Sequence, residues 1–390
     1  MDTVSKIINS IPSSLLSALA VETNVDKFSK KLQGEIIFKL LLYCILTEKE
    51  TSLRGMQSAF ETSVFRAFAN TTDAGSISYS SISERLSVIE FSYFEKIFSS
   101  CVKSYKGEFD KKRNRIIRFD STIVSLSSKL LAVGYNLKGG DADKYRLLKF
   151  TIGYSSIPEA VFFYKDATDN SENVALKNGI VSNWEKQKGQ INVFDRGITS
   201  RANYDFFTEN NITFISRIDP KAKQNLVKEN KPGKKVNTDS LTIKKDSWVF
   251  LYAEGGKKSK HPVRIIQAVK NADNNPISFV TNIKNITAKE ITDIYKSRWD
   301  IEIFFKFIKQ HLNFSHLISR NENGIKVILY VTMIAAILLL QYKKEMQLSG
   351  YKMVKRQFVA DLEKNIIYNI VILCGGNAEK AKDLLYRNST

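Results

Sequence analysis

The sequence predicts an α/β fold, in which a mixed sheet carries an antiparallel β insertion and follows a small helical domain. Three observations support this prediction. Apolar residues recur at helical spacing up to about residue 107. From about residue 115, strand-like segments come in succession and then alternate with helices, as in a mixed sheet. Between 219 and 285, strand-like segments and turn residues return without helices between them.

Residues 1–107 are expected to form the helical domain. The segments 31–46 and 63–70 have apolar residues at helical spacing. Ser81 and Glu84 match a capping box, which predicts a helix beginning there. Such a domain either binds DNA as a helix-turn-helix variant or serves as a dimerisation or scaffolding bundle.

The core sheet is expected over 108–218 and again over 286–345, and a helical tail over 346–390 ends the chain. Three consecutive strands begin the core, and helices then alternate with strands. The strands are 115–126, 145–156 and 159–167, followed by a helix at 174–187, a strand at 190–195, a helix at 200–211 and a strand at 212–218.

Residues 219–285 are expected to form a basic β insertion between the two parts of the core. Residues 219–240 are rich in lysine and indicate a loop. The strands expected after it are 241–245, 247–253, 261–269 and 277–283, with turns at 255–256 and 274–276. The lysines of 221–245, together with Lys257, Lys258 and Lys260, either bind a DNA backbone or form a solvated face.

Composition indicates a cytoplasmic protein with a polyanionic partner. The 390 residues carry a formal net charge of +19, which attracts nucleic acid, although a lysine-rich proteome also gives such an excess. The three cysteines are isolated, which argues against a disulfide framework or a zinc site. The N-terminus is not a convincing signal peptide, and the apolar run 327–340 is short for a membrane span. No membrane is therefore expected among the partners.

The segment YKSRWDIEIFFKFIKQ, residues 295–310, predicts one helix with a narrow polar stripe. At 100° per residue, five polar side chains fall within roughly 80° of the helix circumference. They are Tyr295, Arg298, Glu302, Lys306 and Lys309. Apolar residues flank the stripe on both sides, so the helix is expected to be largely buried, with the stripe in a cleft. A solvated face with Glu–Lys pairs is the alternative.

Two aspartates in strand-like segments are candidate partners for Glu302. Asp120 lies inside 115–126, and Asp195 ends 190–195. An aspartate in an apolar strand is costly unless it is paired or binds metal. A helix cap or a salt-bridged strand end is the ordinary explanation for one such residue alone. Three carboxylates in a basic cleft instead suit Mg²⁺, and two such ions can stabilise both oxygens of a phosphodiester displacement.

These residues carry a resemblance to a known family. The pattern Y-x2-R-x3-E-x6-K, which begins at Tyr295, resembles the signature of DDE transposases of the insertion-sequence-4 type. FDST at 119–122 and FDRG at 194–197 resemble the family's first and second catalytic aspartate motifs. The resemblance covers roughly 110–345. Ile198 departs from it, since an aromatic residue often follows DRG in the family.

The resemblance implies a ribonuclease H-like core that cuts and joins DNA. Asp120, Asp195 and Glu302 would bind two Mg²⁺ ions, for which Mn²⁺ would substitute. A water would cut one strand at the element end, and the freed 3′-OH would later attack target DNA. The implied partners are double-stranded DNA, as element terminal repeats and as target, and a second copy of the chain in a synaptic homodimer.

The resemblance also implies residues that contact DNA, chiefly through the terminal phosphate of the element end. An arginine fork, a lysine and a tyrosine hydroxyl all suit phosphate. The residues expected to contact DNA are Tyr295, Arg298, Lys309, Lys306, Arg196 and Trp299. Trp299 is expected to pack in the core, with stacking on an unpaired base as the alternative.

Two other functions remain open. The chain could be a metal-dependent DNA nuclease on the same core, cutting without strand transfer. It could also be a non-catalytic DNA-binding derivative of a transposase, such as a repressor. The three intact carboxylates argue against the second, because a binding protein has no need to bury them together.

Overall fold

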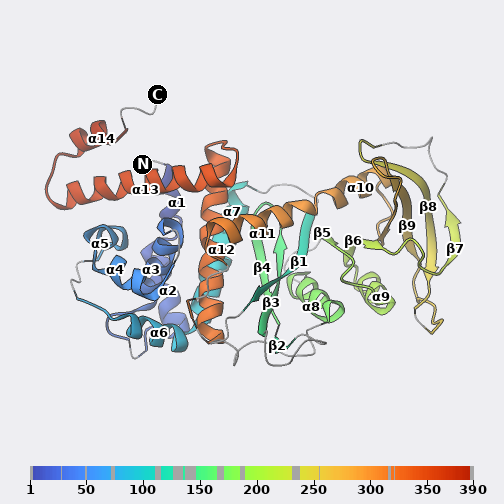
Figure 1. The fold of residues 1–390 in the computed structure, drawn as a ribbon, viewed down its shortest axis with the longest axis horizontal. Coiled ribbons are helices and arrows are strands. Elements are labelled where there is room, and N and C mark those ends of the chain that lie inside the picture. The colour runs from blue at the N-terminus through green and yellow to red at the C-terminus, as the bar shows by residue number, and fades with distance from the viewer. Residues whose placement is uncertain are drawn as a thin grey trace. The chain divides into compact units, whose positions relative to one another are not determined.

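The computed structural model divides the chain into two compact units, whose helices and strands are labelled in Figure 1. Unit 1 comprises Met1–Lys111, Ser125–Leu147 and Lys306–Thr390, and unit 2 comprises Lys112–Val124 and Leu148–Phe305. The residues that the structure describes are 3–27, 29–48, 51–71, 75–109, 116–125, 135–136, 146–164, 171–184, 189–230, 238–253, 255–314, 318–319 and 321–386.

Unit 1 is predominantly helical. Its helices before the sheet are α1 (Thr3–Ile8), α2 (Ser13–Thr23), α3 (Gly34–Thr47), α4 (Leu53–Glu61), α5 (Ser63–Ala69), α6 (Tyr79–Val88) and α7 (Phe91–Phe109). Those near the C-terminus are α12 (Glu322–Glu345), α13 (Tyr351–Leu373) and α14 (Ala378–Tyr386). Every residue of 327–342 in α12 is buried, because this helix packs against α1, α3, α6, α7 and α13. Such all-round burial is typical of a central core helix.

Two segments are long and apolar enough to cross a membrane, namely Thr3–Thr23 and Glu322–Glu345. In the second, 89% of the apolar window is buried within the protein, which confirms the buried helix predicted over 327–340. The first consists of two separate helices, α1 and α2, with a break that includes Pro12. Each of them is much shorter than the roughly 20 residues that a span requires.

Helix α6 begins one turn earlier than the sequence predicted. The predicted capping box of Ser81 and Glu84 is wrong, because Ser81 already lies inside the helix. Ser78 has the extended backbone of an N-cap, and its hydroxyl accepts a hydrogen bond from the Ser81 backbone N–H at 3.1 Å. The sequence holds several serines in succession, so the pattern alone did not select the capping one.

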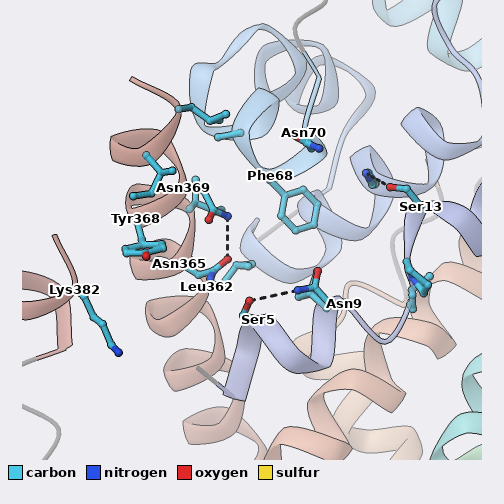
Figure 2. A pocket seen from close by; sticks show the side chains of 18 of the residues that line it. Ser5, Asn9, Ser13, Phe68, Asn70, Leu362, Asn365, Tyr368, Asn369 and Lys382 are labelled. Atoms are coloured by element: carbon cyan, nitrogen blue, oxygen red, sulfur yellow. Dashed lines mark hydrogen bonds between the residues drawn. The ribbon is translucent and has the colours of Figure 1, made fainter. Parts of the chain in front are cut away.

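A cavity of about 860 Å³ lies in unit 1 among helices α1, α2, α3, α5, α13 and α14 (Figure 2). Its lining is rich in asparagine, and Asn369 donates a hydrogen bond to Asn365 at 3.4 Å within it. None of the residues predicted to be catalytic lines this cavity.

Unit 2 holds most of a mixed sheet. Ten strands of the described residues pair in the order β2-β3-β1-β5-β6-β10-β9-β8-β7, and β4 pairs with β3. Their bounds are β1 (Ile116–Ser125), β2 (Tyr135–Asn136), β3 (Arg146–Tyr154), β4 (Pro158–Phe163), β5 (Ile191–Phe194), β6 (Thr213–Ile218), β7 (Gln224–Glu229), β8 (Leu241–Leu251), β9 (Val263–Lys270) and β10 (Pro276–Thr281). β5 is parallel to both β1 and β6. The strands that follow in the sheet, in the order β6, β10, β9, β8 and β7, pair antiparallel. The predicted α/β class with a mixed sheet and a β insertion is confirmed.

Helices cover both faces of this sheet, because alternate residues of each strand point to opposite sides. One face packs against α8 (Glu172–Trp184) and α9 (Arg201–Glu209), and its core includes Phe194 and Phe214. The other face packs against α10 (Ala288–Lys296), and its core includes Val193. Figure 1 shows α8 and α9 on one side of these strands and α10 on the other.

The β insertion extends the core sheet and differs from the prediction in two details. The predicted loop 219–240 contains strand β7, all of whose residues are exposed, so no alternating pattern marked it in the sequence. The predicted strands 241–245 and 247–253 are largely one strand, β8. A register shift between Ile243 and Lys245 interrupts its alternation, which made one strand resemble two.

Candidate active site

Two neighbouring parallel strands bring Asp120 and Asp195 together. The register pairs Phe119 of β1 with Phe194 of β5, so the aspartates that follow these residues lie level on adjacent strands. Such strands are about 4.8 Å apart. Both phenylalanines point into the core under α8 and α9, so by alternation both aspartates point to the face that α10 covers.

Asp195 is held by groups from two other elements. The hydroxyl of Tyr295, on α10, donates a hydrogen bond to Asp195 Oδ1 at 2.8 Å. Ser216, on β6, donates from its hydroxyl to the Asp195 backbone carbonyl at 3.1 Å. The Tyr295 ring packs edge-on against Phe279 with centroids 5.1 Å apart. Burial and the neighbouring Asp195 raise the pKa of Tyr295, so its hydroxyl remains a donor at neutral pH.

Asp120 lies beside a cluster of hydroxyl groups. Its Oδ1 accepts a hydrogen bond from the Ser121 backbone N–H at 2.8 Å. The Ser121 hydroxyl is 3.0 Å from Thr151 Oγ1 and 2.9 Å from the hydroxyl of Tyr164. These contacts connect β1 to β3 and fix the backbone next to the aspartate.

The predicted helix over 295–310 is interrupted. α10 ends at Lys296, and α11 (Trp299–His311) begins three residues later. At the break, the Arg298 N–H donates to the Tyr295 carbonyl at 2.9 Å, and the Ile301 N–H donates to the Arg298 carbonyl at 3.2 Å. These bonds have the tighter spacing of a 3₁₀ turn, so wheel angles do not carry over from Tyr295 to the residues of α11. Neither glycine nor proline marks the break in the sequence.

Glu302 pairs with Arg298 one turn before it. Arg298 Nη2 lies 2.5 Å from Glu302 Oε1, with the arginine side chain 8% exposed and the glutamate 34%. Burial lowers the pKa of Arg298, but Tyr295, Glu302 and Asp195 together outweigh it and raise the pKa overall. The Nε of Arg298 has no hydrogen-bond partner within the part of the chain that the structure describes. Arg298 therefore holds Glu302 and keeps one donor unused.

No ready-made metal site accompanies these acids. The described residues hold no group of three histidine, cysteine, aspartate or glutamate side chains arranged as metal ligands. The strands bring Asp120 and Asp195 together, whereas the Glu302 carboxylate is directed to Arg298. Convergence of all three carboxylates on one ion therefore stays a prediction.

Trp299 is 60% exposed, so the prediction that it packs in the core is wrong. It is the first residue of α11. Ile303, one turn later, is 48% exposed. α11 is therefore less buried than the apolar flanks predicted. Lys306 and Lys309 are exposed on the same helix, and Arg196 is exposed directly after Asp195.

The sequence reasoning missed two arginines near the acids. Arg217, on β6, is close enough to Tyr295 to lower its pKa, and its buried Nε lacks a partner among the described residues. Arg118, on β1, contacts the break between α10 and α11. Both arginines interrupt apolar strand segments, as Asp120 does, and that signal was present in the sequence.

Comparisons with known proteins agree with the resemblance. Residues 111–338 match the family described as "Transposase DDE domain". The chain is 32% identical to "Putative transposase y4zB" of Sinorhizobium fredii, over 39% of this chain and 42% of the relative. It is 29% identical to "Putative transposase for insertion sequence element IS4SA" of Synechocystis, over 62% of this chain and 66% of the relative. A third relative is "Probable transposase for insertion sequence element IS5377" of Geobacillus stearothermophilus. It is 25% identical over 76% of this chain and 79% of the relative. The chain thus matches less than half of the first relative's length and about two thirds of the second's.

Proposed function

Because the chain belongs to the family of DDE transposases, with the ribonuclease H-like fold of that domain, we propose that it binds the ends of an insertion sequence, cuts them and joins them to target DNA. The observation that supports this most is the parallel register of β1 and β5. It sets Asp120 level with Asp195, and the first residue of the signature, Tyr295, binds the second of these acids.

The acids fit a hard divalent cation such as Mg²⁺ or Mn²⁺. Asp120 and Asp195 offer carboxylate oxygens, the ligands that such cations prefer, from rigid adjacent strands. Glu302 would join them by exchanging Arg298 for the metal, which its 34% exposed side chain allows. When bound, a pair of such ions would activate a water and stabilise the leaving oxygen of the phosphodiester.

The basic residues of the signature segment, together with Arg196, would hold the DNA. Arg298 would bind a phosphate oxygen once Glu302 exchanges it for the metal, and Lys306, Lys309 and Arg196 are exposed. The exposed indole of Trp299 suits stacking on an unpaired base. The lysines of the insertion add positive charge that binds backbone without sequence preference, in keeping with the net charge of +19.

Each region of the chain would have its own part in this function. The helical region 1–107 would bind the element ends, or would scaffold the protein. The core of 108–218 and 286–345 would carry the chemistry, the insertion 219–285 would contact DNA, and the tail 346–390 has no assigned role. Two copies would act as a homodimer when the two ends are brought together, and the cytoplasm would be the site of action.

Strand transfer tests this proposal. We expect the wild-type protein, with Mg²⁺ and DNA that ends in a free 3′-OH at the element boundary, to join that end to a second DNA. Cleavage without any joined product would instead favour a nuclease on the same core. Binding of the ends with neither cleavage nor joining, under Mg²⁺ or Mn²⁺, would favour the non-catalytic DNA-binding protein.

A further inference from the structure

Arg118 connects β1 to the break between α10 and α11. It precedes Asp120 by two residues, so both side chains leave the same face of the strand. Its Nε donates to the Ser297 carbonyl at 2.6 Å, and its Nη1 donates to the Ser155 carbonyl at 3.0 Å. Its Nη2 lies 3.0 Å from Asp300 Oδ2, and the Arg118 side chain is 11% exposed. All three nitrogens of one buried guanidinium therefore have protein partners.

The break is the joint that determines where Glu302 lies. On one side of it, α10 carries Tyr295, which is bound to Asp195. On the other side, α11 carries Glu302 on its first turn. Because each helix is rigid, a change of backbone angle at Ser297 would move the Glu302 carboxylate relative to the two aspartates. Arg118 contacts Ser297 within the joint and Asp300 on α11, directly beyond it.

We propose that Arg118 is a positioning residue that fixes the third carboxylate, Glu302, against the strand that carries Asp120. This inference rests on the proposed function of the same site. Arg118 acts on Glu302 through the backbone carbonyl of Ser297 and the side chain of Asp300. Its nitrogens are engaged with the protein, which distinguishes it from the phosphate-binding role proposed for Arg298.

The alternative is that Arg118 only satisfies buried carbonyls and so supports the fold. Arg264 provides a matched control for that alternative. It lies on β9 in the same unit, its side chain is 6% exposed, and it pairs with Asp246 at 2.6 Å. It also donates to the backbone carbonyl of Ile286 at 2.7 Å. The same substitution at Arg264 removes similar bonds without altering the contacts of Ser297.

The experiment compares Arg118→Lys and Arg118→Met with Arg264→Lys and Arg264→Met. Thermal unfolding, binding to element-end DNA and the cleavage rate at several Mg²⁺ concentrations are measured for each. We expect the cleavage rate to fall about tenfold for Arg118→Lys and on the order of 100-fold for Arg118→Met, with DNA binding unchanged. The Mg²⁺ concentration for half-maximal rate should rise several-fold, because Glu302 reaches its position less often. The Arg264 variants should lose comparable stability and keep the wild-type Mg²⁺ dependence below their unfolding temperature.

Three results would overturn the inference. Arg118 and Arg264 variants that lose cleavage only in proportion to their unfolded fraction, with unchanged Mg²⁺ dependence, would make Arg118 a structural residue. A wild-type protein that cuts, together with Arg118 variants that cut equally well at every Mg²⁺ concentration, would remove the inference and leave the proposed function intact. A wild-type protein that binds the ends and never cuts would remove the proposed function, and this inference with it.

Discussion

At the residue scale, two of the acids have partners at the end of α10 and in the break that follows it. Asp195 accepts a hydrogen bond from the hydroxyl of Tyr295, and Glu302 accepts one from the guanidinium of Arg298. A tyrosine hydroxyl and an arginine were both expected to bind phosphate. In the structure they instead bind the acids, so each of the two carboxylates has a hydrogen-bond partner in a partly buried site.

Removing the Tyr295 hydroxyl tests the first of these contacts. We expect Tyr295→Phe to lower the cleavage rate about tenfold, because Asp195 loses a hydrogen bond worth roughly 1.5–3 kcal/mol when the acceptor is charged. The ring would keep its packing against Phe279, so the fold should persist. Tyr342→Phe is the matched control, since its hydroxyl also donates to a carboxylate, that of Asp361 at 2.6 Å. Equal cleavage losses in the two variants would contradict a local role for Tyr295.

The exposure of Trp299 leads to a second prediction. We expect Trp299→Ala to change the free energy of unfolding by less than about 0.5 kcal/mol, as at most surface positions, but to weaken cleavage through lost stacking on DNA. Phe304→Ala is the contrasting variant. Phe304 is fully buried and stacks on Tyr154 with centroids 4.7 Å apart, so its loss should cost about 3–5 kcal/mol. A large stability loss for Trp299→Ala would show that the indole packs inside the protein.

The residue types of the site were predictable, but their pairing was not. Asp120 and Asp195 stood out because an acid in an apolar strand needs a reason, and the strand register does align them. The partner of Glu302 depends on the local path of residues 297 and 298. Neither glycine nor proline marks that path in the sequence, and one of its contacts, from Arg118 to the Ser297 carbonyl, comes from a strand distant in the chain.

At the element scale, the C-terminal end of α11 is joined to α3 by one half-buried lysine. Lys355, on α13, donates to the backbone carbonyls of His311 at 2.8 Å and Ile45 at 3.2 Å. These carbonyls lie at helix C-termini, where intrahelical partners are lacking and a cation is favoured. Burial lowers the pKa of Lys355 to about 8, and Glu48 opposes that shift.

This lysine predicts a rise of stability with pH. Between about pH 8 and the ordinary lysine value near 10.4, the unfolded chain binds a proton that the folded chain lacks. The free energy of unfolding should therefore increase over that range, by at most about 3 kcal/mol at 1.36 kcal/mol per pKa unit. Urea unfolding at about pH 8 and about pH 10 measures it. Lys355→Met should abolish the rise, whereas Lys352→Met, at an exposed position on the same helix, should retain it.

Elements with strong periodic patterns were predicted from the sequence, and those without them were not. The buried helix at 327–340 and the core strands had apolar patterns that packing then satisfied. Strand β7 has no buried residue, so its position depends on backbone bonds to β8 and not on side-chain pattern. The serine that caps α6 was one of several adjacent candidates.

At the scale of the whole molecule, the sheet connects the strands that carry the candidate catalytic acids to the basic insertion. β10 pairs directly with β6, so the insertion continues the sheet that holds the acids. The antiparallel strands were predictable from turns and alternation, whereas their attachment to β6 is a long-range pairing that no local pattern encodes. The net charge of +19 then gives the whole protein an attraction for DNA that does not depend on any one residue.

The most direct test of the account is Mg²⁺-dependent cleavage of element-end DNA by Asp120→Asn, Asp195→Asn and Glu302→Gln, compared with wild type. Asp205→Asn serves as the control. Asp205, on α9, is a buried acid that accepts hydrogen bonds from the backbone N–H groups of Lys260 and His261 in the insertion. We predict that all four variants bind the ends, that wild type and Asp205→Asn cut at the element boundary, and that the first three variants do not. Cleavage at the wild-type rate by any of those three would contradict the proposed site.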